Sequence, residues 1–334
     1  MQLQGKSVLV TGGAGFIGSH LVDQLSDCRV RVLDNLTTGK EANLAGANCE
    51  FVRGDILDRT LVAELMRDAD VVFHLACRGV RHSIGNPVES HLVNAEGTLR
   101  LLVEAHRAGV ERFVHVSSSE VYGTARYAPM DEQHPTFPET VYGAAKLAGE
   151  AYVRAYRQTY GLPTVVVRPF NNFGPRSHHE GDSGEVIPRF AVWALNGKPP
   201  VIFGDGSQTR DFIYVEETAA WLRRAAECDE LVGQTVNLGS GVETSVAELA
   251  TMIYEEVGRA DLRPEFQPRR PGDVDRHLAH VQLARDVLDF KTRINVREGI
   301  GRLIAHLRST HANPAELLSE TSTINWQPKE RSAA

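Results

Sequence analysis

The chain has 334 residues, of which 42% are hydrophobic and 24% are charged, and its formal net charge is −7. That length provides core for one large α/β domain or two smaller ones, and the mildly acidic balance argues against nucleic acid as the main partner. Cys28, Cys49, Cys77 and Cys228 lack C-x-x-C spacing, which disfavours a zinc site or a disulfide framework. We find no signal-peptide pattern and no apolar run of membrane-spanning length, so we expect a cytoplasmic protein without membrane contact.

The first two predicted elements are a buried strand at residues 7–11 and a helix at residues 19–25, joined by a glycine-rich loop. Gly12, Gly15 and Gly18 have the spacing and the strand-to-helix context of a dinucleotide-binding fingerprint. The first glycine permits a tight turn, the second lets backbone N–H groups approach a pyrophosphate, and the third lets helix and strand pack closely. The helix N-terminus adds partial positive charge, so the loop predicts a bound dinucleotide.

A second strand, residues 30–33, ends at Asp34, where an acid is expected to bind the adenosine ribose. A carboxylate there accepts hydrogen bonds from ribose hydroxyls and repels a 2′-phosphate, so NAD is favoured over NADP. Further strands are predicted at residues 49–54 and 70–75. Asp55 follows the third strand, where contact with adenine and capping of a helix at residues 58–66 are equally good explanations. His74 lies in an apolar strand and is predicted to be a core histidine.

A long helix is predicted at residues 88–108, followed by a strand at residues 112–117 that leads to Ser118. Beyond it, Tyr142 and Lys146 are four residues apart, which places both side chains on one face of a helix. The ammonium group favours the phenolate form of the tyrosine, so Tyr142 is predicted to act as a general base. Ser118 can bind the same substrate hydroxyl, and the proline-containing loop between these residues is expected to form part of a substrate mouth.

The second half of the chain begins with a strand at residues 163–168 and a polar, unpatterned segment at residues 170–184. This segment contains His178, His179, Glu180 and Asp182, but adjacent side chains rarely point at one ion, so no metal site is expected. A polar arm is expected from His311 onward, with Trp326 near its end. Periodicity predicts strands at residues 201–203 and 235–238, one more strand after residue 209, and helices at residues 186–196, 215–226, 245–257, 282–288 and 296–307.

Taken together, the motifs resemble the extended short-chain dehydrogenase/reductase family that modifies nucleotide sugars. The matching segments are T-G-G-A-G-F-I-G-S-H from Thr11, D-N-L from Asp34, G-D-I from Gly54, H-L-A from His74, S-S-S-E-V-Y-G from Ser117, Y-G-A-A-K from Tyr142, R-P-F-N from Arg168, G-D-G-S-Q-T-R-D-F from Gly204 and R-R-P-G-D from Arg269. The segments follow the family order, and as a set they are specific for the family rather than for one reaction.

The resemblance implies a doubly wound parallel Rossmann sheet that binds NAD, topped by a smaller domain that binds a nucleotide-diphosphate (NDP) sugar. The dinucleotide domain would span residues 1–170, with residues 211–240 returning to it. The sugar-binding domain would comprise residues 171–210 and 241–310, and residues 311–334 would form a C-terminal arm. The resemblance further implies a homodimer through the helices near residues 94–108 and 146–160.

The resemblance also implies roles for individual residues. Tyr142 would be the base, Lys146 would bind the nicotinamide ribose and lower the tyrosine pKa, and Ser118 would orient the sugar 4-hydroxyl. Asn171 would hold a phosphate or sugar oxygen, and Arg210 and Arg270 would clamp the diphosphate, which suits planar guanidinium groups. The implied NAD contacts are Gly12, Gly15, Phe16, Ile17, Gly18, Asp34, Asn35, Asp55, Ile56, Leu75, Ala76, Asn94, Tyr142 and Lys146.

The sequence departs from the family patterns at two adjacent positions. Position 119 is Ser where the dTDP-glucose 4,6-dehydratases carry Asp, and Glu120 stands where common UDP-galactose 4-epimerases have a non-acidic residue. We therefore count Glu120 as a fourth catalytic residue and expect an enzyme that works through a 4-keto sugar. A 4,6-dehydratase is preferred, followed by a 4-epimerase and then by a C6 decarboxylase. The alternative from another class is a non-catalytic NAD-binding sensor, against which the complete set of Ser118, Tyr142 and Lys146 argues.

Overall fold

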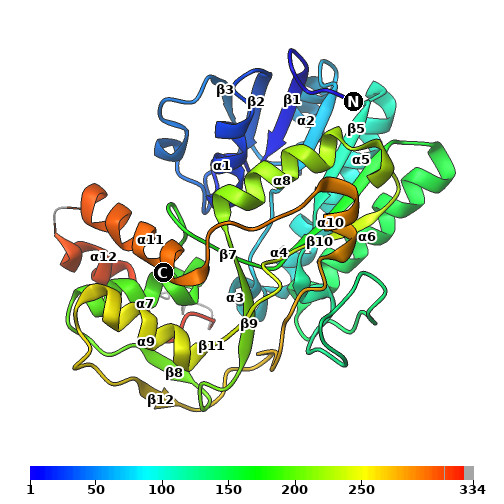
Figure 1. Ribbon diagram of the computed structural model, residues 1–334. Helices are drawn as coiled ribbons and strands as arrows, with labels where there is room; N and C mark the ends of the chain where they lie inside the picture. Colours follow the sequence, from blue (N-terminus) through cyan, green and yellow to red (C-terminus); the bar gives the residue numbers. More distant parts are fainter. Residues whose placement is uncertain (312, 327–334) are drawn as a thin grey trace.

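The computed structural model describes residues 1–311 and 313–326, and a seven-stranded parallel sheet forms its larger part (Figure 1). Across the sheet the strand order is β10-β6-β5-β4-β1-β2-β3. The chain starts in the middle, runs outward through β2 and β3, and returns to β4 on the other side of β1. The carboxyl ends of β1 and β4 therefore flank a topological switch point, where open α/β sheets bind ligands. The strands are β1 (Ser7–Thr11), β2 (Arg29–Asp34), β3 (Cys49–Arg53), β4 (Val71–His74), β5 (Arg112–Val116), β6 (Thr164–Pro169) and β10 (Thr235–Leu238).

Helices cover both faces of this sheet, because alternate strand residues point to opposite sides. Val8 and Val10 face a core shared with α1 (Phe16–Gln24), α8 (Val215–Glu227) and α10 (Gln282–Leu288). Leu9 faces the opposite core, which is built with three other helices, α2 (Arg59–Met66), α5 (Gly97–Ala108) and α6 (Val141–Tyr160). The doubly wound fold class predicted from the sequence is confirmed.

The second, smaller part has its own apolar core, which includes Ile187, Phe190, Leu249 and Ile300. In Figure 1 its helices lie together on one side of the molecule. Its small sheets have the strand orders β11-β9-β7 and β12-β8. The elements are β7 (Asn171–Phe173), α7 (Val186–Leu195), β8 (Val201–Phe203), β9 (Thr209–Tyr214), β11 (Glu243–Ser245), α9 (Val246–Val257), β12 (Glu265–Gln267), α11 (Val296–Thr310) and α12 (Pro314–Glu320).

Several elements differ from the sequence prediction. The long helix expected at residues 88–108 is divided into α4 (Pro87–His91), a π-helical stretch (Leu92–Glu96) and α5, and a short helix, α3 (Val80–Gly85), precedes it. The expected unpatterned segment contains β7 and one short 3₁₀ turn (Gly181–Ser183); the other 3₁₀ turns are Glu41–Leu44, Ser119–Val121 and Asp229–Leu231. The side chain of Asp58, not that of Asp55, caps α2, so the capping explanation for Asp55 was wrong.

The division of the chain into domains also needs a correction. The sequence assigned residues 241–310 entirely to the sugar-binding part. In the structure Ala284, Leu288 and Phe290 pack into the core of the large sheet, beside β10 and α8. The α10 segment therefore returns to the dinucleotide part, because its apolar face completes the cover over β10. No helix among the described residues is both long enough and apolar enough to cross a membrane.

A buried ion pair holds α6 against the sheet. Glu150, on α6, accepts hydrogen bonds from Arg168 at 2.6 and 2.8 Å and from Ser117 at 2.6 Å, and both charged side chains are buried. Burial alone would raise the pKa of Glu150, but Arg168 outweighs that effect and holds the pKa below its usual value. Arg168 also donates to Tyr122 Oη, which in turn donates to Asn237 on β10. One polar network therefore joins α6, β5, β6 and β10.

We predict that Glu150→Gln destabilises the protein by about 3–5 kcal/mol, because it leaves the Arg168 cation buried without its counter-ion. The matched control is Arg154→Gln, which removes the second, half-exposed partner of the same carboxylate and should cost less than about 1 kcal/mol. The free energy of unfolding in urea measures both changes. If both variants lost the same small amount of unfolding free energy, the buried ion pair would not be important for stability.

Candidate active site

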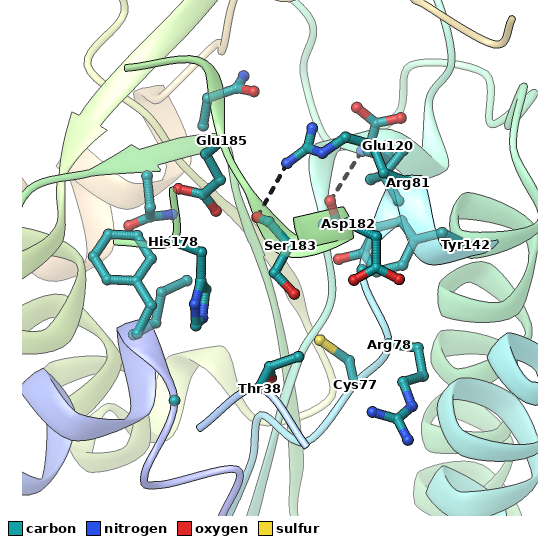
Figure 2. A pocket seen from close by; sticks show the side chains of 18 of the residues that line it. Thr38, Cys77, Arg78, Arg81, Glu120, Tyr142, His178, Asp182, Ser183 and Glu185 are labelled. Carbon is teal, nitrogen blue, oxygen red and sulfur yellow. Dashed lines mark hydrogen bonds between the residues drawn. The ribbon is translucent and has the colours of Figure 1, made fainter. Parts of the chain in front are cut away.

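A pocket opens at the carboxyl ends of the central strands and extends to the smaller part of the molecule. Figure 2 shows part of its wall, with Tyr142, Glu120, Arg81 and Glu185 around the same space. All but one of the predicted site residues line it. These are Gly12, Gly15, Phe16, Ile17, Gly18, Asp34, Asn35, Asp55, Ile56, Leu75, Ala76, Ser118, Glu120, Tyr142, Lys146, Asn171, Arg210 and Arg270.

The glycine loop forms one end of the pocket. Gly12 has a φ of +73°, and a Cβ there would lie 2.6 Å from the backbone nitrogen of Ala76. A Cβ on Gly18 would collide with the carbonyl oxygen of Gly12. Gly15 is the N-cap of α1 and provides no side-chain acceptor for the first amides of the helix. These N–H groups therefore fit a pyrophosphate, which the dinucleotide would supply.

The acid at the end of β2 is positioned by backbone amides. The Asp34 carboxylate accepts hydrogen bonds from Ala14 at 3.0 Å and Leu36 at 2.8 Å. Burial raises the pKa of Asp34, although these two hydrogen bonds oppose the shift. Asp55 accepts a hydrogen bond from Asn35 Nδ2 at 2.9 Å, so both residues belong to the same wall. The arrangement fits an adenosine ribose and adenine beside Asp34 and Asp55.

Asn94 is the predicted cofactor contact that does not line the pocket. Its side chain is buried and is bonded to the backbone of Arg78, with Oδ1 accepting from the amide at 2.8 Å and Nδ2 donating to the carbonyl at 2.9 Å. Asn94 therefore holds the backbone of Arg78, a residue that lines the pocket. His74 is a core histidine as predicted, since its two ring nitrogens lie 2.8 and 2.9 Å from the hydroxyls of Thr11 and Thr98.

The predicted catalytic groups meet where α6 begins beside the end of β5. Thr140 caps α6 by accepting a hydrogen bond from Gly143 N at 3.1 Å, which fixes the first turn that carries Tyr142. Lys146 Nζ donates to the carbonyl of Val116 at 2.9 Å and lies 6.0 Å from the centre of the Tyr142 ring. Burial raises the pKa of Tyr142 well above its usual value, while a hydrogen bond with Ser118 acts in the opposite direction.

The sequence predicted that Lys146 lowers the pKa of Tyr142. In the structure, burial of Tyr142 has the largest effect and raises this pKa. Lys146 is itself buried, and burial lowers its pKa. Burial disfavours both the phenolate form of Tyr142 and the ammonium form of Lys146, because the surrounding protein solvates charge poorly. The role of Lys146 as a cofactor ligand that activates the tyrosine remains a prediction.

Glu120 and Ser119 both line the pocket, but their side chains have different neighbours. Glu120 lines the pocket, and burial raises its pKa, although Arg210 and Arg270 oppose the shift. The Ser119 hydroxyl lies 3.4 Å from His277 Nδ1 and is buried. A carboxyl group is therefore available at position 120, whereas the neighbouring hydroxyl contacts a core histidine.

The two arginines predicted to clamp the diphosphate share one carboxylate. Asp273 Oδ1 accepts from Arg210 at 2.9 Å and from Arg270 at 2.8 Å, which brings their guanidinium groups together on the pocket wall. Asn171 lies on the same wall and donates to the carbonyl of Asp211 at 3.3 Å. The geometry is suitable for binding two phosphates, and the clamp remains a prediction.

Sequence reasoning missed several charged residues of the pocket. Arg81, on α3, donates to the carbonyl of Ser183 at 3.4 Å (Figure 2), and burial lowers its pKa to about 10. Glu185 lies on the far side of the same space, and burial raises its pKa to about 7. Arg81 had no sequence signal of its own, whereas Glu185 directly follows the polar segment at residues 170–184, whose unusual composition was the one available signal. Within residues 1–311 and 313–326 we find no group of three or more His, Cys, Asp and Glu side chains that could hold a metal.

Comparisons with known proteins agree with this geometry. The profile of the NAD dependent epimerase/dehydratase family matches residues 8–239. A UDP-glucose 4-epimerase from Mycolicibacterium smegmatis is 40% identical over 311 residues, which cover 90% of this chain and 98% of the relative.

Two solved structures are also similar. The UDP-N-acetylglucosamine 4-epimerase from Methanobrevibacter ruminantium has a TM-score of 0.87, 34% identity and coverage of 93% and 100% of the two chains. The dTDP-glucose 4,6-dehydratase DesIV from Streptomyces venezuelae, solved with NAD bound, has a TM-score of 0.86, 32% identity and coverage of 92% and 98%.

These matches span nearly the whole chain, and they coincide with a pocket that carries the glycine loop, the acid after β2 and the Ser118, Tyr142 and Lys146 group. The non-catalytic alternative is therefore set aside, and NAD is the cofactor. The chain belongs to the NAD-dependent epimerase/dehydratase family of nucleotide-sugar enzymes.

Proposed function

We propose that the chain is an NDP-hexose 4-epimerase that works in the cytoplasm. In this reaction the sugar 4-hydroxyl is oxidised to a ketone, the 4-keto sugar turns over within the pocket, and the ketone is reduced from the other face. Bound NAD supplies the redox chemistry at C4. The preference for a dehydratase that the sequence suggested is thereby reversed, since epimerases are among the most similar relatives.

The residues of the chain have separate tasks in this proposal. Tyr142 removes the proton from the 4-hydroxyl and later returns it, and Ser118 bonds the same oxygen. Lys146 would hold the nicotinamide ribose and stabilise the phenolate. Arg210 and Arg270 would bind the diphosphate through charge-assisted hydrogen bonds.

One observation supports the epimerase most directly. Loss of water from C6 requires a base at C5 and an acid at the departing hydroxyl. Position 119 provides only a serine hydroxyl, and that hydroxyl lies against His277. The site therefore lacks the Asp–Glu pair that the dTDP-glucose 4,6-dehydratases carry at these two positions, and an epimerase needs neither group.

A 4,6-dehydratase remains the second candidate because of Glu120. Its carboxyl group lines the same pocket, and burial raises its pKa, so it could in principle take a proton from C5 and deliver it to the C6 oxygen. A single residue with both tasks is chemically reasonable. The C6 decarboxylase is the third candidate, because UDP-glucuronic acid decarboxylases are also among the relatives, at 33% and 32% identity.

Identifying the product in D₂O separates these candidates. We predict that the wild-type enzyme, tested against UDP-, dTDP- and GDP-hexoses, converts one substrate into its C4 epimer without solvent deuterium at C5, as followed by NMR. Glu120→Gln should change turnover by less than about tenfold, because no step of epimerisation needs that base. A 4-keto-6-deoxy product with deuterium at C5, abolished by Glu120→Gln, would establish the dehydratase instead.

Tyr142→Phe should reduce kcat by ~10²–10⁴-fold while the bound NAD content stays the same, because the ring remains and only the proton acceptor is lost. The active tyrosine must be unprotonated and its pKa is raised, so wild-type kcat/KM should increase with pH, and the variant should lose that increase. Steady-state rates across pH, together with cofactor content after denaturation, provide the measurement. Near-native turnover of the phenylalanine variant would exclude Tyr142 as the base.

We also propose that the enzyme is a homodimer that pairs through α5 and α6. Tyr160, near the end of α6, and Leu92, just before α5, are large apolar residues exposed in the single chain. Exposed apolar side chains on adjacent helices are typical of protein–protein contacts.

A further inference from the structure

The C-terminal arm, of which residues 311 and 313–326 are described, crosses the smaller part, and its last described residues lie beside the pocket. Its helix α12 packs on α7, with Leu317 buried in that core. Asn196 on the turn after α7 donates to the carbonyl of Pro314 at 2.9 Å. These contacts anchor the first part of the arm, and the following residues run toward the sugar-binding side of the pocket.

Near the last described residues of the arm, Asn325 contacts the loop at residues 181–185, which includes residues of the pocket wall. Asn325 is buried, and its Nδ2 donates to the carbonyls of Gly181 and Gly184, at 3.1 Å each. That loop presents Ser183, whose carbonyl accepts a hydrogen bond from Arg81, and it leads directly into Glu185. Asn325 therefore joins this part of the wall to the arm, in addition to the contact between His82 and Asp182.

The arm also provides acceptors for a cation in the pocket wall. Arg189 on α7 lines the pocket and is buried, and burial lowers its pKa to about 9. Its Nη2 donates to the backbone carbonyls of Ser322 at 2.6 Å and Thr323 at 3.0 Å. No carboxylate among the described residues forms an ion pair with Arg189 within 4.0 Å, so these carbonyl dipoles and the Trp193 ring, 4.8 Å from the guanidinium, stabilise its charge.

Trp326 contacts two further residues that line the pocket, Phe203 and Arg270. Its ring meets that of Phe203 edge to face, with centroids 4.7 Å apart, and the Arg270 guanidinium lies 5.9 Å from the Trp326 ring. Phe203 and Arg270 both line the pocket. A cation beside an indole face is favoured, so Trp326 restricts the orientation of an arginine predicted to bind diphosphate.

We propose that residues 320–326 are a positioning element for the nucleotide-sugar half of the active site. They fix the loop at residues 181–185 through Asn325, the Arg189 side chain through backbone carbonyls, and Phe203 and Arg270 through Trp326. The inference rests on the proposed function, since it assumes that this half of the pocket binds an NDP-sugar. The contacts do not include the glycine loop or Asp34, so NAD binding is independent of the arm.

Asn325→Asp and Trp326→Ala test this role in the full-length enzyme. Asn325→Asp keeps the shape but removes the two donated hydrogen bonds and places a carboxylate against carbonyls. Each variant should raise KM for the NDP-sugar by about tenfold or more, as expected for a lost charge-assisted or buried polar contact, with little change in kcat. NAD content should be unchanged, and Trp326→Phe should restore most of the affinity. The matched control is Glu316→Gln on the exposed side of α12, which should behave as wild type.

Other outcomes distinguish this inference from the proposed function. An unchanged KM in both variants, or a parallel fall in kcat, NAD content and melting temperature, would overturn the positioning role. If the wild-type enzyme converts no NDP-sugar, the proposed function fails, and calorimetric titration with UDP and dTDP then tests the arm alone. Weaker nucleotide binding by the variants than by Glu316→Gln would support the inference, and equal binding would refute it.

Discussion

The buried ion pair between Glu150 and Arg168 is the contact on which the geometry of the active site depends. It joins α6 to β6 deep below the pocket, and Ser117 on the same carboxylate adds the end of β5. Because an α-helix is a stiff element, fixing residue 150 also fixes Tyr142, about two turns earlier, against Ser118. A buried pair of this kind contributes little net stability, but its loss is costly. Its value here is positional, since the reacting groups come from two separate segments of the chain.

The pocket combines two surfaces with different chemistry. The dinucleotide end is built from backbone amides, close glycine contacts and the carboxylates after β2 and β3, all of which belong to the large sheet. The sugar end is lined by arginines and carboxyl groups from α3, α7 and the loops of the smaller part. Tyr142 and Ser118 lie where these surfaces meet. With NAD at the first surface and the sugar at the second, as we propose, substrate choice would depend on side chains that the cofactor does not contact.

The sequence was informative where function requires a local pattern. Gly12, Gly15 and Gly18 are constrained by their immediate neighbours, and Tyr142 and Lys146 by one helical turn, so spacing alone predicted their places. Arg81, Glu185 and Asn325 come from a short helix, an unpatterned loop and a polar arm, and only tertiary packing brings them to one pocket. Asn94 holds the backbone of Arg78 in the structure, and a buried amide in that role has the same sequence signature as one that touches a ligand, so its contact with NAD stays a prediction. The π-helical stretch at Leu92–Glu96 could not be predicted from the sequence either, since its residues continue an ordinary helical pattern.

The central claim is that the chain oxidises and reduces the same carbon of one sugar within one pocket. The most direct test uses the accepted NDP-hexose with deuterium at C4, and locates the label in the product by NMR. We predict that deuterium remains on C4 of the epimeric sugar, because the hydride that leaves this carbon returns to it. A product with deuterium at C6 beside a 4-ketone, or loss of the label to solvent, would contradict it.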